Sequence, residues 1–127
     1  MADIAVDYGR KRTGFAICLA GVVLPQNPLV DTTWTGIVRR IRTLQTEHGC
    51  GTVVLGLPLT SAGKPTELSS EVELLSAFLI REGFQVKLQR ETGSTREAIL
   101  NKPDDRRDGK QDSLAAAVIL KRYLGQP

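Results

Sequence analysis

The sequence predicts an α/β fold in which a mixed five-stranded sheet is flanked by helices. Three short apolar strand patterns come first, with turns between them that are too short for a crossover, so these strands should form an antiparallel meander. Two later strand patterns each follow a helical pattern and should therefore run parallel to the first strand. No repeat or linker interrupts this order, and residues 1–127 are expected to form a single domain.

The first three strands are defined by short apolar runs. Ile4 to Asp7 begins with three apolar residues, which is typical of a strand buried on both faces. The second strand is expected over Thr13 to Leu19 and the third over Val22 to Leu24. Because proline cannot donate to a strand ladder, Pro25 and Pro28 should end the third strand.

The remaining elements alternate between helix and strand. Helices are indicated by apolar residues three or four positions apart that follow a Ser or Thr able to cap them. Thr32 or Thr33 can cap the first helix, and the second begins either at Thr66 or at the capping-box pair Ser70 and Glu73. The expected elements are a helix over 34–48, a strand over 52–55, a helix over 66–81, a strand over 84–88, a short helix over 94–100 and a helix over 112–124.

The composition is that of an ordinary soluble globular protein, with 41% apolar and 24% charged residues. A net charge of +3 permits nucleic-acid binding without requiring it. No apolar stretch approaches the length of a membrane span, and the first residues lack the pattern of a signal peptide. These features predict a cytoplasmic protein that does not bind membranes.

Three acidic residues from distant parts of the sequence are expected at one edge of the sheet. Asp7 and Glu91 each come at or just past the carboxyl end of a predicted parallel strand, where such sheets place their ligands. Asp112 begins the last helix, on the side of its apolar residues Ala115 and Ala116. Each acid also has an ordinary interpretation: a hairpin turn at Asp7, a surface position at Glu91 and a helix cap at Asp112.

Clustered carboxylates repel one another and stay ionised when a divalent cation lies between them. Mg²⁺ and Mn²⁺ accept oxygen ligands and retain waters that can be deprotonated, and two such ions can stabilise the attacking and leaving oxygens of phosphodiester hydrolysis. Three cations, Arg10, Lys11 and Arg12, follow Asp7 directly and would neutralise phosphates beside the cleaved bond. The residues therefore suggest a metal-dependent hydrolase that acts on a polyanion.

Four sequence blocks, which together cover nearly the whole chain, resemble the YqgF/RuvX family of bacterial RNase H-like nucleases. The blocks are Asp7-Tyr8-Gly9-Arg10-Lys11-Arg12-Thr13-Gly14; Val54-Leu55-Gly56-Leu57-Pro58-Leu59 with Gly63; Glu91 with Ser94-Thr95 and Glu97-Ala98; and Asp112-Ser113-Leu114-Ala115-Ala116 with Ile119-Leu120 and Tyr123-Leu124. This chain has Arg90-Glu91-Thr92 where the family usually has Asp-Glu-Arg, and Ser94-Thr95 where it has two threonines.

The resemblance implies an RNase H-like fold, related to the junction resolvase RuvC, and a site with two Mg²⁺ or Mn²⁺ ions. By position in the motifs, Asp7, Glu91 and Asp112 would be the catalytic, metal-binding acids, with Asp7 bridging the ions. The resemblance also implies nucleic-acid contacts, and Thr60 equally fits an ordinary loop. The residues expected to contact nucleic acid are Arg10, Lys11, Arg12, Thr60, Ser94 and Thr95.

The resemblance implies two substrates. The first is structured or single-stranded RNA, at the 5′ end of precursor 16S ribosomal RNA during ribosome biogenesis. The second is the four-way DNA junction, whose cleavage would require a homodimer rather than a monomer. A catalytically weak nucleic-acid-binding module is a further alternative. Actin-like ATPases share the Asp-x-Gly strand, but they need a second domain for which this chain is too short.

Overall fold

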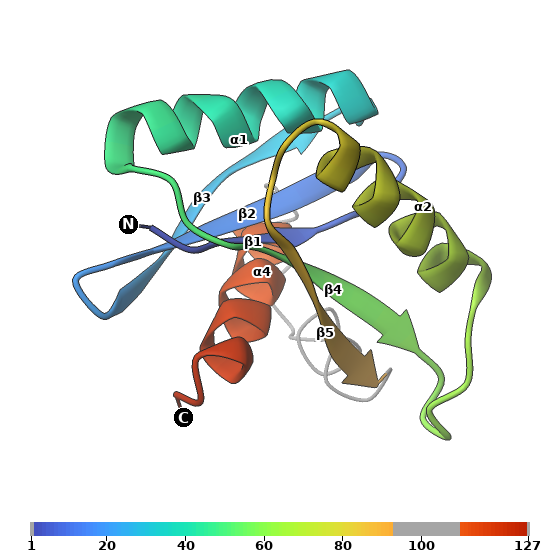
Figure 1. The fold of residues 1–127 in the computed structure, drawn as a ribbon. Coiled ribbons are helices and arrows are strands. Elements are labelled where there is room, and N and C mark those ends of the chain that lie inside the picture. Colours follow the sequence, from blue (N-terminus) through green and yellow to red (C-terminus); the bar gives the residue numbers. More distant parts are fainter. Residues whose placement is uncertain (1, 93–109, 127) are drawn as a thin grey trace.

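The computed structural model describes residues 2–92 and 110–126 and contains the predicted mixed sheet of five strands (Figure 1). The strands lie in the order β3-β2-β1-β4-β5; β2 pairs antiparallel with β1 and β3, whereas β4 is parallel to β1 and β5. The short helix expected over 94–100 lies outside the described residues. The elements are β1 (Ile4–Asp7), β2 (Arg12–Leu19), β3 (Val22–Val30), α1 (Trp34–His48), β4 (Val53–Leu59), α2 (Glu67–Arg81), β5 (Val86–Thr92) and α4 (Lys110–Tyr123).

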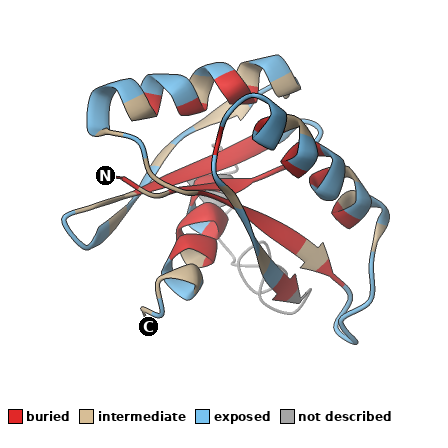
Figure 2. Cartoon of the chain, viewed as in Figure 1, coloured by how far each residue is buried: buried red, intermediate tan, exposed pale blue. Residues whose placement is uncertain are grey.

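Helices cover both faces of the sheet, with α1 and α2 on one face and α4 on the other (Figure 1). Alternate residues of β1 divide between the two layers: Ile4 and Val6 pack into the core beneath α1 and α2, while Ala5 packs against α4. The central strands are buried almost throughout (Figure 2). None of the helices in the described ranges has the length and apolar character of a membrane span.

The third strand does not end before its prolines, as expected, but continues through both to Val30. Pro25 pairs in register with Ala16 of β2. Because β3 is an edge strand, it has a neighbour on one side only, and a proline there does not break a ladder on the other side. The prediction of a short third strand was therefore wrong.

The last strand is shifted relative to its prediction, which was a strand over 84–88. Phe84 donates its amide to the carbonyl of Leu79 at 3.1 Å, so this residue completes the end of α2 instead of starting β5. The strand then continues to Thr92, and Glu91 pairs with Pro58 of β4. Glu91 thus lies inside the strand rather than just past its end.

Both helices on the face of the sheet covered by α1 and α2 begin at capping residues. The helix α1 has the predicted bounds, and Thr33 accepts a hydrogen bond from the amide of Gly36 at 3.0 Å. At α2 the cap is Thr66, which forms a reciprocal box with Ser69 at 3.0 and 2.7 Å. The alternative start at Ser70 is therefore wrong, because the box closes four residues earlier.

The packing of α4 on the sheet depends on small residues. Ala5 and Ala16 lie in the strands, and Ala116 lies opposite them in the helix. Gly56 of β4 is buried, and a Cβ at this position would lie only 2.4 Å from the Cδ1 atom of Ile119. The missing side chain of Gly56 therefore lets α4 approach the middle of the sheet.

We predict that Gly56→Ala lowers the free energy of unfolding by about 1–3 kcal/mol, because the added methyl group overlaps a buried side chain. Ile119→Val removes the overlapping Cδ1 atom and should by itself cost about 0.5–1.5 kcal/mol. The double variant should be less destabilised than the sum of the two single variants. Urea denaturation of the four proteins measures this, and simple additivity would contradict the contact.

Candidate functional site

Two buried carboxylates lie on the face of the sheet that packs against α4. Asp7 is the last residue of β1 and shares the face of Ala5, two positions before it. On β5, Gln89 pairs with Gly56, and Glu91 follows two positions later on the same face. Asp7 is only 5% exposed and Glu91 only 7%. Buried carboxylates at this edge need nearby positive charge or hydrogen-bond donors to stay ionised.

Gly56 also separates the two acids on the intervening strand. Val6 pairs with Leu55, so Gly56 comes next along β4, beside the end of β1. A Cβ at Gly56 would lie 3.9 Å from the Cγ atom of Glu91. The absence of a side chain at Gly56 therefore lets Ile119 of α4 and the side chain of Glu91 lie against the sheet beside the end of β1. A glycine inside an apolar strand run indicates such a close approach, although sequence reasoning did not assign this role to Gly56.

The Glu91 carboxylate is held by an arginine from the other end of the chain. Its Oε2 atom accepts a hydrogen bond from Nη1 of Arg122, at 3.0 Å. Arg122 is the second-last residue of α4, and its side chain is 41% exposed. This ion pair connects α4 to β5. No sequence motif predicted Arg122, because the pair depends on how the helix crosses the sheet.

Asp112 is the third described residue of α4 (Lys110–Tyr123), and the described part of the helix includes two residues before the expected start. Asp112 is therefore inside the helix, and the alternative that it caps the helix is wrong. Ala115 and Ala116, three and four positions later, are both buried, and Ala116 packs against the sheet. The side chain of Asp112 lies outside the described part, so its place beside Asp7 and Glu91 stays a prediction. The described side chains include no cluster of three metal-ligating residues.

The turn between β1 and β2 is built around the buried hydroxyl of Thr13. This hydroxyl accepts from the amide of Gly9 at 3.3 Å and donates to the carbonyl of Gly9 at 3.2 Å. It also hydrogen bonds to the Thr32 hydroxyl at 2.9 Å. Gly9 has no room for a side chain, because a Cβ would lie 2.3 Å from the carbonyl oxygen of Arg12. These contacts fix the turn that carries the three cations.

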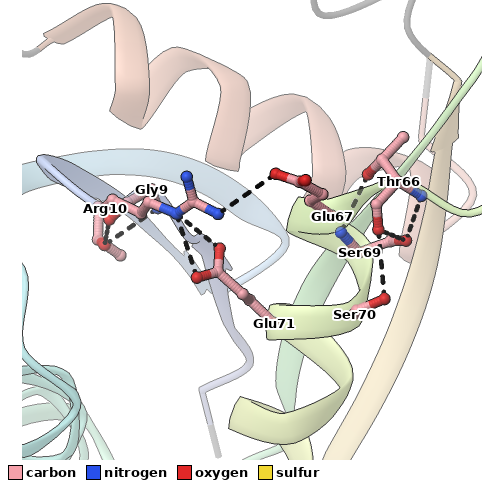
Figure 3. Close-up of polar contacts among 8 residues, drawn as sticks. Gly9, Arg10, Thr66, Glu67, Ser69, Ser70 and Glu71 are labelled. Atoms are coloured by element: carbon pink, nitrogen blue, oxygen red, sulfur yellow. Dashed lines mark hydrogen bonds and ion pairs between the residues drawn. The ribbon is translucent and has the colours of Figure 1, made fainter.

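The three cations of this turn do not share one environment. Arg10 donates from Nε to both carboxylate oxygens of Glu71 at 2.9 and 3.1 Å, and its Nη2 lies 4.0 Å from Glu67 (Figure 3). The hydrogen bond and charge of Glu71 raise the pKa of Arg10. Arg10 thus links the turn to α2, on the face opposite α4. Lys11 and Arg12 are exposed.

Arg12 is placed differently from Arg10. It is the first residue of β2, two positions before Gly14, which pairs with Asp7. Because residues two apart in a strand share a face, Arg12 belongs to the same side of the sheet as the two acids. Among the three cations of the turn, the strand register therefore favours Arg12 as the one nearest the candidate site.

The other predicted contacts have separate outcomes. Thr60 follows β4, and its hydroxyl accepts from the amide of Lys64 at 3.0 Å. Its own amide donates to the Lys64 carbonyl at 2.9 Å, so Thr60 closes the loop between β4 and α2. This geometry favours the ordinary loop interpretation of Thr60. Ser94 and Thr95 lie outside the described residues.

Two solved structures resemble this fold. The large terminase nuclease of thermophilic phage G20c, with bound zinc, matches with a TM-score of 0.59 and 15% identity, over 96% of this chain and 80% of that one. RuvC of Thermus thermophilus, in complex with a Holliday junction substrate, matches with a TM-score of 0.54 and 12% identity, over 98% and 96%. These similarities confirm the predicted RNase H-like fold.

Sequence comparison identifies closer relatives. A protein of Thermus thermophilus is 34% identical over 96% of each chain, and one of Sulfurovum is 32% identical over 94% of this chain and 95% of that one; both carry the provisional name pre-16S rRNA nuclease. Ribonuclease YqgF of Deinococcus radiodurans is 28% identical, over 95% and 85%. The RuvX family model, described as Holliday junction resolvase, matches residues 1–126. This chain belongs to the RuvX family.

Proposed function

We propose that this protein is a divalent-metal-dependent nuclease, a single domain over residues 1–127, which hydrolyses phosphodiester bonds in RNA and trims the 5′ end of precursor 16S ribosomal RNA. One observation carries the proposal: Asp7 and Glu91 are buried carboxylates on the same face of the sheet, on either side of Gly56. The names of its relatives support RNA as the substrate.

The residues present suit Mg²⁺ or Mn²⁺. Both acids offer carboxylate oxygens, which these hard cations prefer. Gly56 adds no side chain of its own beside Glu91, where a Cβ would lie 3.9 Å from the Cγ atom of that residue. Asp112 would be the third ligand, brought to this face by α4. The Mg²⁺ or Mn²⁺ ions, when bound, supply activated water and stabilise the negative charge that develops on the phosphate.

The chain itself would bind and orient the substrate. Asp7 and Glu91 are carried by strands rather than loops, so the backbone holds the two carboxylates at a constant separation. Arg12, on the same side of the sheet, would bind a phosphate beside the cleaved bond, and the exposed Lys11 a neighbouring one. Arg10 would act indirectly, by joining the turn to α2.

Asp7→Asn and Glu91→Gln should each lower the cleavage rate by about 100-fold or more, because each removes a charged ligand from the site. The assay uses Mn²⁺ with labelled single-stranded RNA, a precursor 16S rRNA fragment and a four-way junction. Matched controls are Asp3→Asn, which keeps the acceptor for the Thr52 amide, and Glu73→Gln on the exposed side of α2. The nuclease proposal fails if wild type and the Asp7 variant cut all three substrates equally poorly.

Junction resolution is the second candidate function, favoured by the description of the family model. It would require two active sites related by symmetry, and therefore a homodimer. The same assay separates the two functions. Preferential cutting of the four-way junction, together with a dimer in sedimentation analysis, would replace RNA processing as the assigned role.

Arg12→Ala should weaken RNA binding and flatten its salt dependence more than Arg10→Ala does, because Arg12 belongs to the face of the two acids whereas Arg10 is directed to Glu71 of α2 on the opposite face. Loss of one phosphate contact lowers the slope of log K against log salt by about one. Both substitutions are introduced into the Asp7→Asn protein, which keeps the RNA intact, and fluorescence anisotropy is measured over a series of KCl concentrations. Equal changes in slope would show that the pairing with Glu71 does not exclude Arg10 from RNA.

A further inference from the structure

The ion pair between Glu91 and Arg122 joins a buried carboxylate of β5 to the end of α4. The Glu91 side chain is only 9% exposed, whereas its partner, the side chain of Arg122 at the end of α4, is 41% exposed. Their atoms Oε2 and Nη1 lie 3.0 Å apart. The guanidinium therefore supplies a full positive charge directly to a carboxylate proposed to bind a metal ion.

The positive charge of Arg122 lies beside one of the two buried acids. Asp7 and Glu91 lie on one face of the sheet, and like charges in a poorly solvated place raise each other's cost of ionisation. A cation hydrogen-bonded to one of them lowers this cost. Arg122 provides such a cation when no metal ion is bound, and a bound divalent ion would provide the same compensation more strongly.

We propose that Arg122 is a positioning residue that serves as the counter-ion of Glu91 in the metal-free protein and thereby weakens the binding of the divalent ion. This inference rests on the proposed function, since it assumes that Glu91 is a metal ligand. The guanidinium compensates the negative charge of the carboxylate and holds it in place. It also repels the incoming ion and occupies one of the two oxygens that the ion would use.

A purely structural link predicts a different pattern. If Arg122 only fastens α4 to β5, its loss lowers stability by the same amount with and without metal, and metal affinity stays the same or falls. If Arg122 is a counter-ion, its loss destabilises the metal-free protein most. Mn²⁺ then restores much of the lost stability, because the ion replaces the missing charge.

The test compares wild type with Arg122→Gln, Arg122→Lys and a matched control, Lys121→Gln. Lys121 is the exposed neighbour of Arg122 on the same helix, so its substitution removes the same charge without the contact. Thermal unfolding is followed with and without MnCl₂, and the Kd for Mn²⁺ is measured by isothermal titration calorimetry.

Arg122→Gln should lower the metal-free Tm, enlarge the Mn²⁺-induced rise in Tm and tighten Mn²⁺ binding by about tenfold relative to Lys121→Gln. For Arg122→Lys, the metal-free Tm, the Mn²⁺-induced rise in Tm and the Kd for Mn²⁺ should lie between those of wild type and Arg122→Gln. If Arg122→Gln does not fold, the comparison of Arg122→Lys with Lys121→Gln tests the proposal. Unchanged or weaker Mn²⁺ binding in the Arg122 variants overturns this proposal alone. Absence of Mn²⁺ binding by wild type and all variants overturns the metal site of the proposed function as well.

Discussion

The close packing of α4 on small residues of the sheet is the constraint on which the rest of the structure depends. Ala5 and Ala16 are small residues of β1 and β2, and Gly56 lies on β4, between the strands that carry Asp7 and Glu91. Together they let the backbone of α4 come near enough for Ile119 to fill the space between helix and sheet. The same approach buries the face that carries Asp7 and brings Arg122 to Glu91. Larger side chains on this face would move the helix outward and separate the two halves of the candidate site.

The two faces of the sheet have different physical roles. Toward α1 and α2 the strands present large apolar side chains, including Phe15 and Leu55, and this layer holds most of the buried hydrophobic volume. Toward α4 the side chains are small in the middle and acidic at the carboxyl edge. Stability therefore comes mainly from one layer. The other layer can bury two carboxylates because the stability of the first layer offsets the cost of their desolvation.

Local patterns predicted the helices better than the strand ends. The bounds of α1 follow from its cap at Thr33 and its apolar periodicity, both of which act within a few residues. The ends of β3 and β5 depend on neighbours instead. Pro25 is tolerated because β3 has only one neighbour, and Phe84 is excluded from β5 because its amide is bound by α2. A strand ladder is a contact between distant segments, so its length is not set by the strand alone.

The sequence by itself determined the order of the described elements, the mixed sheet and the placement of Asp7 and Glu91 near its carboxyl edge. These follow from hydrophobic patterns and from the rule that parallel strands are joined by crossovers. Only the tertiary structure decided that Arg10 pairs with Glu71, Arg122 with Glu91, and Gly56 with Ile119. Each of these contacts joins residues from different elements, and its formation depends on how closely two elements pack, which no local pattern specifies.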